Sequence, residues 1–206
     1  MDMNTHNTRN TKSSRSHRGF TLVEMMISIA LLSLLMAVAV PSFRGMMMKN
    51  RSQTTINTLM LSLNLARSEA VKRNQQVALC KSADGATCTT AGAWEQGWLV
   101  FVDLDQDGVW DAVVVDDANT TLIDESIGGE EIIRVEEAFE NDFTLTSTTA
   151  ADWFAYGPDG SGRSSGGLVN GTFLLCPSDG DEENANRVVT NITGRPLVKE
   201  GAPSCP

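Results

Sequence analysis

The stretch Gly19–Phe43 reads GFTLVEMMISIALLSLLMAVAVPSF, and its 21 residues from Phe20 to Val40 carry one ionisable side chain, that of Glu24. A helix needs about 20 apolar residues to cross the hydrocarbon core of a bilayer, so this run is long enough to span a membrane. A carboxylate at the bilayer centre costs on the order of 2.5–3.5 kcal/mol, and an acid in such a helix is a candidate functional residue. Glu24 therefore needs a cationic partner.

The charge is distributed unevenly along the chain. The whole chain has a formal charge of −10, whereas residues 1–19 are basic, with four cations against Asp2: Arg9, Lys12, Arg15 and Arg18. A basic flank before an apolar span predicts that the N-terminus stays cytoplasmic and that the remainder crosses the membrane. The acidic remainder argues against a constitutive nucleic-acid binder, because phosphate contacts need clustered Lys and Arg.

The polar leader, residues 1–19, ends at Gly19, before the apolar run. A signal peptidase would cut after such a run and discard it. Cleavage after Gly19 would instead keep the helix and create a new amino group at Phe20, four residues from Glu24. The alternative is an uncleaved single-span anchor with a tolerated acid near its end.

A second helical pattern follows the apolar segment 20–43, which ends near Pro41. In residues 44–76 apolar side chains recur at helical spacing, at Ile56, Leu59, Met60, Leu63, Ala66 and Ala70. This pattern predicts an amphipathic half that needs a partner surface. One helix from about Thr21 to Asn74 would be roughly 80 Å long at 1.5 Å per residue.

The remaining residues, 77–206, change to the two-residue alternation of β-strands. The strand candidates are Gln76–Cys80, Gly97–Val102, Ala112–Val115, Glu131–Val135, Phe143–Leu145, Trp153–Tyr156, Gly171–Cys176, Arg187–Asn191 and Arg195–Val198. Residues 158–167 and 178–186 are predicted to be loops. Short strands after one long helix indicate an α+β fold in which an antiparallel sheet packs on the amphipathic half.

All four cysteines, Cys80, Cys88, Cys176 and Cys205, lie beyond the apolar run. That side of the membrane is oxidising, which suits two disulfides. A bond between Cys80 and Cys88 would close a short polar loop and leave Cys176 with Cys205. A reduced pair or pairing with the distal cysteines stays open, because spacing does not choose among the three connectivities.

An acidic loop joins two of the strand candidates. Asp103, Asp105 and Asp107 alternate before Gly108, which is how an EF-hand calcium loop begins. The twelfth position should then supply a bidentate Glu, but it is Val114, and only Asp111, Asp116 or Asp117 could compensate. The loop is predicted to be an ordinary solvated turn without a cofactor, with calcium as the alternative.

The N-terminal residues resemble the type IV prepilin family, whose signature is a glycine followed by Phe-Thr-Leu-x-Glu; here it is Gly19 to Glu24. The resemblance implies that a prepilin peptidase cleaves after Gly19 and methylates Phe20. It also implies that Glu24 pairs with the N-terminal amine of a neighbouring subunit. The expected fold is then the type IV pilin fold.

The head is similar to FimT and FimU minor pilins and to GspH pseudopilins. The similar stretches are Leu63–Ala70, Gly97–Asp103, Ile132–Val135, Phe173–Cys176 and Thr193–Arg195. Some FimT-like proteins are implicated in DNA uptake through a C-terminal Gly-Arg-x-Arg segment. Here Gly194-Arg195-Pro196-Leu197 lacks the second arginine, so Arg195 with Lys199, Arg187 and Arg163 would give only weak, salt-sensitive binding.

The resemblance implies a minor type IV pilin that primes or caps pilus assembly through its N-terminal helix, with other minor and major pilins as partners. It would be a single-pass protein of the bacterial inner membrane with a periplasmic head, and later part of the pilus tip. The alternatives are a FimT-like DNA receptor and a GspH-like pseudopilin of type II secretion. An enzyme is not expected, because the histidines, His6 and His17, lie in the leader.

Overall fold

The computed structural model describes residues 19–111, 129–139, 142–167, 170–180, 182, 184–201 and 205. Its one long helix, α1, runs from Leu22 to Arg73 and continues through Pro41, close to the limits that the sequence predicts. The chain divides into two compact units at Gly45 and Met46. α1 belongs to both, so its two halves are described separately.

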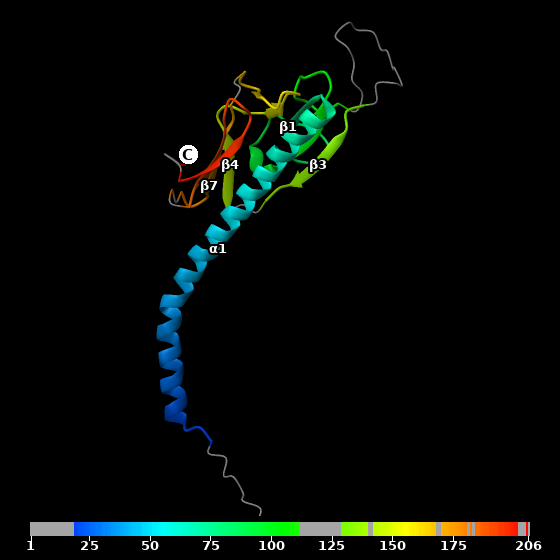
Figure 1. The fold of residues 1–206 in the computed structure, drawn as a ribbon. Helices are drawn as coiled ribbons and strands as arrows, with labels where there is room; N and C mark the ends of the chain where they lie inside the picture. The colour runs from blue at the N-terminus through cyan, green and yellow to red at the C-terminus, as the bar shows by residue number, and fades with distance from the viewer. Residues whose placement is uncertain are drawn as a thin grey trace, which may run out of the picture. The chain divides into compact units, whose positions relative to one another are not determined.

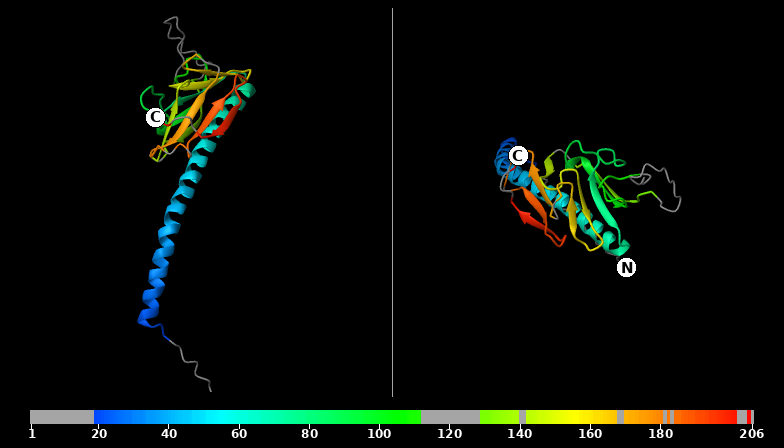
Figure 2. Two further views of the ribbon diagram at one scale, coloured as in Figure 1. Left: turned by 90° about the vertical axis from the view of Figure 1, so that its left-hand side faces the viewer. Right: turned by 90° about the horizontal axis from the view of Figure 1, so that it is seen from above.

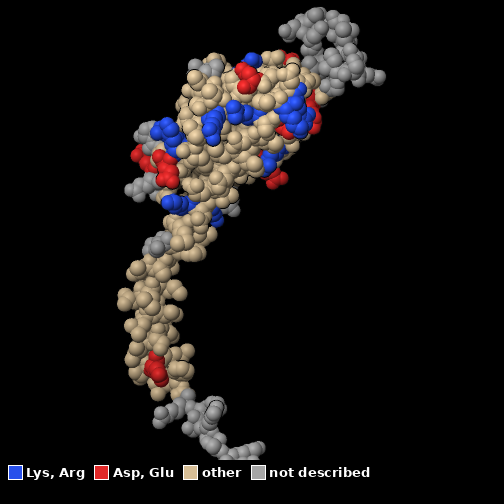
Figure 3. All heavy atoms as spheres, in the orientation of Figure 1, with Lys and Arg blue, Asp and Glu red and all other residues tan. Residues whose placement is uncertain are grey.

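The N-terminal half of α1 exposes its apolar side chains on every side. Leu22, Leu34, Leu35 and Val38 are each at least two-thirds exposed. Figure 3 shows this half as largely free of charged side chains. By length and composition, α1 could cross a membrane, and it has a stretch of mean hydropathy 2.4.

The C-terminal half of α1 lies against two antiparallel sheets (Figure 1). The first sheet has the strand order β3-β2-β1-β5-β6. Its members are β1 (Gln76–Lys81), β2 (Gly97–Asp103), β3 (Ile132–Glu137), β5 (Trp153–Tyr156) and β6 (Gly162–Ser164). A short 3-10 helix, η1 (Trp94–Gln96), precedes β2.

The second sheet has the order β4-β7-β8-β9. Its strands are β4 (Phe143–Ser147), β7 (Thr172–Pro177), β8 (Asn186–Thr190) and β9 (Pro196–Glu200). Consecutive strands in this order pair antiparallel. The views in Figure 2 show β9, drawn in red, at the margin of the head.

The main core lies between α1 and the sheets. Most of the predicted helical stripe is buried there, with Met60 only partly buried: Ile56, Leu59, Leu63, Ala66 and Ala70 are at most 1% exposed. Aromatic rings meet edge to face in this core, Phe154 with Tyr156 of the same strand β5, and Trp94 of η1 with Phe173 of β7. A smaller cluster, which includes Leu99 and Phe101, covers the other side of the first sheet.

Two expectations about the head are corrected. The segment 158–167 is not only a loop, because β6 lies within it and pairs with β5. The strands also form two sheets instead of one, since β4 pairs with β7 and not with β3. The predicted strand Ala112–Val115 lies outside the described residues.

Candidate functional site

The residues of the predicted processing and assembly site lie at the start of α1. Gly19 and Phe20 precede the helix, and Phe20 is 86% exposed. The Thr21 hydroxyl accepts a hydrogen bond from the backbone N–H of Glu24 at 3.2 Å. Thr21 is therefore the N-cap, and Thr21-x-x-Glu24 has the spacing of a capping box. Residues 1–18 of the leader lie outside the described residues.

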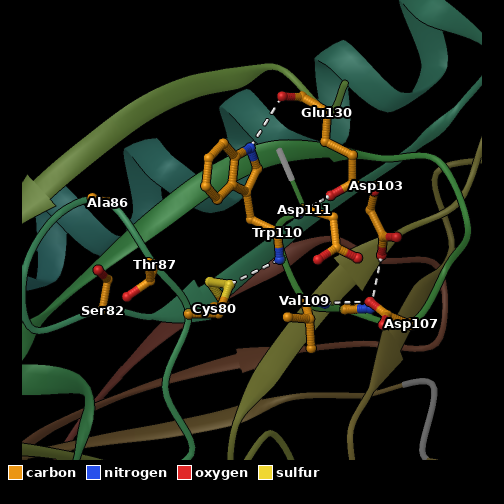
Figure 4. The surroundings of a disulfide bond; sticks show 12 residues. Cys80, Ser82, Ala86, Thr87, Asp103, Asp107, Val109, Trp110, Asp111 and Glu130 are labelled. Atoms are coloured by element: carbon orange, nitrogen blue, oxygen red, sulfur yellow. Dashed lines mark hydrogen bonds between the residues drawn. A yellow bond between two sulfur atoms is a disulfide. The ribbon is translucent and has the colours of Figure 1, made fainter. Parts of the chain in front are cut away.

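The structure contains the two disulfides Cys80–Cys88 and Cys176–Cys205. The first joins β1 to the loop that follows it, and the second joins β7 to the end of the chain. The Trp110 backbone N–H donates to Cys88 Sγ at 3.1 Å, so the first disulfide contacts the acidic loop (Figure 4). Both disulfides fix segments that regular secondary structure does not hold.

Asp103 organises the acidic loop from the end of β2. Its side chain is buried and accepts hydrogen bonds from Gln76 Nε2 at 2.7 Å, the Gln106 N–H at 2.8 Å and the Gly108 N–H at 3.2 Å. Gly108 has φ +79°, and a Cβ there would lie 2.3 Å from the Trp153 ring. Only glycine fits this turn without displacing the half-buried Trp153 ring.

Glu130 is the member of this site that the sequence did not single out. It is buried and accepts hydrogen bonds from the backbone N–H groups of Leu104 at 2.7 Å and Asp111 at 2.9 Å. Its own carbonyl accepts a hydrogen bond from Trp110 Nε1 at 3.0 Å (Figure 4). The signal in the sequence was an acid directly before an apolar strand, which spacing alone does not connect to the loop.

These carboxylates form two overlapping groups. Asp103, Asp105 and Glu130 make the first and Asp105, Asp107 and Asp111 the second, with the ligand atoms of each group within 4.8 Å of one another. Burial, opposed by hydrogen bonds, raises the pKa of Asp103 to about 6 and that of Glu130 to about 7. An all-oxygen set of this kind suits a hard cation such as Ca²⁺.

The raised pKa values give a pH dependence of stability in the absence of divalent cations. Because both pKa values lie above those of the unfolded chain, the folded state binds more protons between about pH 4 and pH 7. Stability is therefore expected to fall as the pH rises through this window. Thermal unfolding of the full chain in detergent and EDTA from about pH 5 to pH 8 measures the slope.

Glu130→Gln removes one titrating group and is expected to flatten this slope. The matched control is Glu131→Gln, because Glu131 is exposed and its neighbour Arg73 lowers its pKa, which moves its titration to more acidic pH. An unchanged dependence of Tm on pH in Glu130→Gln would contradict the raised pKa of Glu130.

The cations predicted as a weak nucleic-acid site are separated by the fold. Arg195 and Lys199 are exposed at the start of β9 and within it, and Arg187 lies opposite Lys199 on β8. Arg163 lies on β6 of the other sheet and donates to Gln76 and Gln106. Arg67 of α1 ties two turns to the helix through the carbonyls of Gly160 and Thr193. Figure 3 shows Lys and Arg in a band across this face of the head.

Structural comparison shows the fold. The type IV minor pilin FimU of Pseudomonas aeruginosa superposes with a TM-score of 0.50 at 17% identity, over 76% of this chain and 96% of that one. The minor pseudopilin EpsH of the Vibrio cholerae type 2 secretion system gives a TM-score of 0.42 at 10% identity, over 72% of this chain and 96% of that one. The expected α+β type IV pilin fold is confirmed.

Two family models match the sequence, and no curated protein does. The prokaryotic N-terminal methylation motif matches residues 14–40, which include Gly19, Phe20 and Glu24. The model described as type II transport protein GspH matches residues 55–194, about two thirds of the chain. The family and its relatives are structural pilins and pseudopilins. The chain belongs to the GspH family, and its N-terminus carries the methylation motif.

Proposed function

We propose that the protein is a minor pilin that primes or caps a type IV pilus, assembled through the N-terminal half of α1. A prepilin peptidase cleaves after Gly19 and methylates Phe20. The mature protein starts in the inner membrane with its head in the periplasm and joins other minor and major pilins near the filament tip. The observation that carries the proposal is Glu24, the one acid in the exposed apolar N-terminal half of α1, which begins three residues after Gly19.

The chemistry at this end of the helix supports assembly. Cleavage after Gly19 would place a cationic amine four residues from Glu24. Opposite charges attract far more strongly in an apolar environment than in water, so the amine of one subunit and the Glu24 of another can fix their register. The surrounding Leu, Met and Val side chains, which are exposed in the single chain, supply the buried area.

Mass spectrometry of the mature protein tests the processing step. The protein isolated from membranes or pili is expected to begin at Phe20 and to carry one methyl group on its amine. Cells that lack the prepilin peptidase supply the control and should yield the intact chain. A mature protein that retains residues 1–19, or begins elsewhere, would contradict the proposal.

DNA uptake is a second function to be tested, because Lys199 on β9 and Arg195 just before this strand are both exposed. A gel shift with the full chain in detergent, over a series of salt concentrations, decides the point. Phosphate contacts make affinity fall steeply with salt, so absence of binding at low salt excludes a DNA receptor.

A role in type II secretion would be indicated by secretion genes beside the gene for this protein.

We also propose that the acidic loop binds Ca²⁺. The two carboxylate groups described above share Asp105, and the alternation Asp103-x-Asp105-x-Asp107-Gly108 is that of a calcium loop. Glu130 supplies a carboxylate from outside the loop. It could take the place of the Glu that an EF-hand has at its twelfth position. A divalent cation would offset the repulsion among these acids and join the loop to the residues before β3.

The calcium proposal predicts a thermal shift that depends on one shared ligand. A ligand that binds only the folded state at a hundred times its Kd stabilises it by about 2.7 kcal/mol. Ca²⁺ is therefore expected to raise the Tm of the full chain, and much less so that of Asp105→Asn. Asp159→Asn, in an exposed turn, is the control and should keep the full shift. No shift in the unmodified protein, or an equal shift in Asp105→Asn, would contradict the site.

A further inference from the structure

β9 is the open edge of the second sheet. It pairs with β8 on one side, and within the described residues no strand pairs with its other side. The Asn191 N–H donates to the Arg195 carbonyl at 3.2 Å, at the start of this ladder. Because hydrogen-bonded residues alternate in an antiparallel pair, the backbone groups of Val198 and Glu200 point away from β8. Figure 2 shows the strand at the margin of the head.

Like charges lie directly opposite each other at this edge. Arg187 of β8 is the cross-strand partner of Lys199, an arrangement that destabilises a sheet unless an anion is near. The Arg187 Nε is buried and has no hydrogen-bond acceptor among the described residues. Among the described residues, neither Arg187 nor Lys199 forms an ion pair.

Alternate residues of β9 share one face, so Lys199 lies on the same side of the sheet as Leu197 and, just before the strand, Arg195. Leu197 is 48% exposed and Arg195 is exposed. This face therefore presents a cation, an apolar side chain and a second cation in succession. Within the described residues, no strand pairs with the backbone donors and acceptors of the edge beside it.

We propose that β9 binds an extended acidic segment of another protein, which adds to the sheet as a further strand. The main chain of that segment pairs with the open groups of Val198 and Glu200. Its acidic side chains, at alternate positions, face Lys199 and Arg195, and an apolar residue between them contacts Leu197. Strand addition of this kind takes affinity from the backbone and specificity from alternate side chains.

The observations favour a peptide over a nucleic acid. An unpaired strand edge complements a peptide backbone, whereas a polyanion uses only the cations. The net charge of −10 also opposes a long polyanion, and specific binding to DNA takes more phosphate contacts than these cations supply. Lys199 and Pro196 on an edge strand also hinder unspecific pairing, so an acidic partner would be selected from among the strands that could approach.

Peptide binding to the full chain in detergent micelles tests the proposal. The probe is the peptide Thr-Glu-Thr-Val-Thr-Glu-Thr, in which Glu, Val and Glu share one face of a strand, and its counterpart has Lys in place of both Glu. The immobilised protein is expected to bind the acidic peptide at least about tenfold more tightly, a difference of about 1.4 kcal/mol. Lys199→Glu should remove this preference. Val198→Pro, which takes away an edge N–H that β8 does not use, should abolish binding.

Lys72→Glu is the matched control, with the same charge change on an exposed lysine of α1, and should bind as the unmodified protein does. Equal binding of both peptides, no binding of the acidic one, or full binding by Val198→Pro would overturn the proposal. Binding of a short DNA duplex that Lys199→Glu abolishes and Val198→Pro retains would assign the face to nucleic acid instead. The outcome does not depend on Glu24 or on filament assembly.

Discussion

Glu24→Gln is expected to leave membrane insertion and the head intact while the protein disappears from sheared pili. The apolar run keeps its length and loses a charge, so insertion becomes easier. Removing one partner of a buried ion pair costs roughly 3–5 kcal/mol, which would lower incorporation at least about a hundredfold. Immunoblots of the membrane fraction measure insertion, and immunoblots of the sheared-pilus fraction measure incorporation.

Glutamine separates two roles of this residue. Both Glu and Gln serve at the third helical position of a capping box, so the local start of α1 is retained, while the charge that would attract an amine is lost. Ser28→Ala is the control one turn along, since the Ser28 hydroxyl donates only to the Glu24 carbonyl within the helix at 2.7 Å. Normal incorporation of Glu24→Gln would show that Glu24 acts as a cap and not as an ionic partner.

Leu63→Ala is expected to produce the largest loss of stability among single changes in α1. Leu63 is fully buried in the core that joins α1 to both sheets. Truncating a buried leucine to alanine costs about 2–5 kcal/mol, from lost burial and from the cavity that remains. For a chain of this size, that corresponds to a fall in Tm of about 5–15 °C. Thermal unfolding followed by circular dichroism measures it.

Leu61→Ala is the matched control. It is the same substitution two residues away, on the exposed side of α1, where Leu61 is 52% exposed. Its effect should stay within about 0.5 kcal/mol. Equal losses in the two variants would mean that the helix does not bury the face described here.

The helix was predictable because its signals are local. The apolar run and the helical spacing of Leu59, Leu63 and Ala70 all lie within one segment. β6 was missed because Gly162, Arg163 and Ser164 carry no apolar alternation, and its strand exists only through pairing with β5. The division into two sheets likewise depends on pairings between distant segments.

The functional residues divide in the same way. Gly19, Phe20 and Glu24 stand in one short motif, so their proposed roles follow from its resemblance to the prepilin signature. Glu130 joins the acidic loop through contacts with the Leu104 and Asp111 amides, which no sequence pattern records. The disulfide connectivity was left open for a related reason, since only the fold brings Cys176 within reach of Cys205.

The cap at Thr21 has a consequence for maturation. The helix begins after Thr21, so the Gly19–Phe20 peptide bond lies outside the helical hydrogen bonds. A protease could therefore bind this bond without unwinding a helical turn. Cleavage there would leave an ammonium group at the positive pole of the helix dipole, where cations are disfavoured. The carboxylate of a neighbouring subunit would offset this repulsion, so the proposed cleavage would itself prepare the subunit for polymerisation.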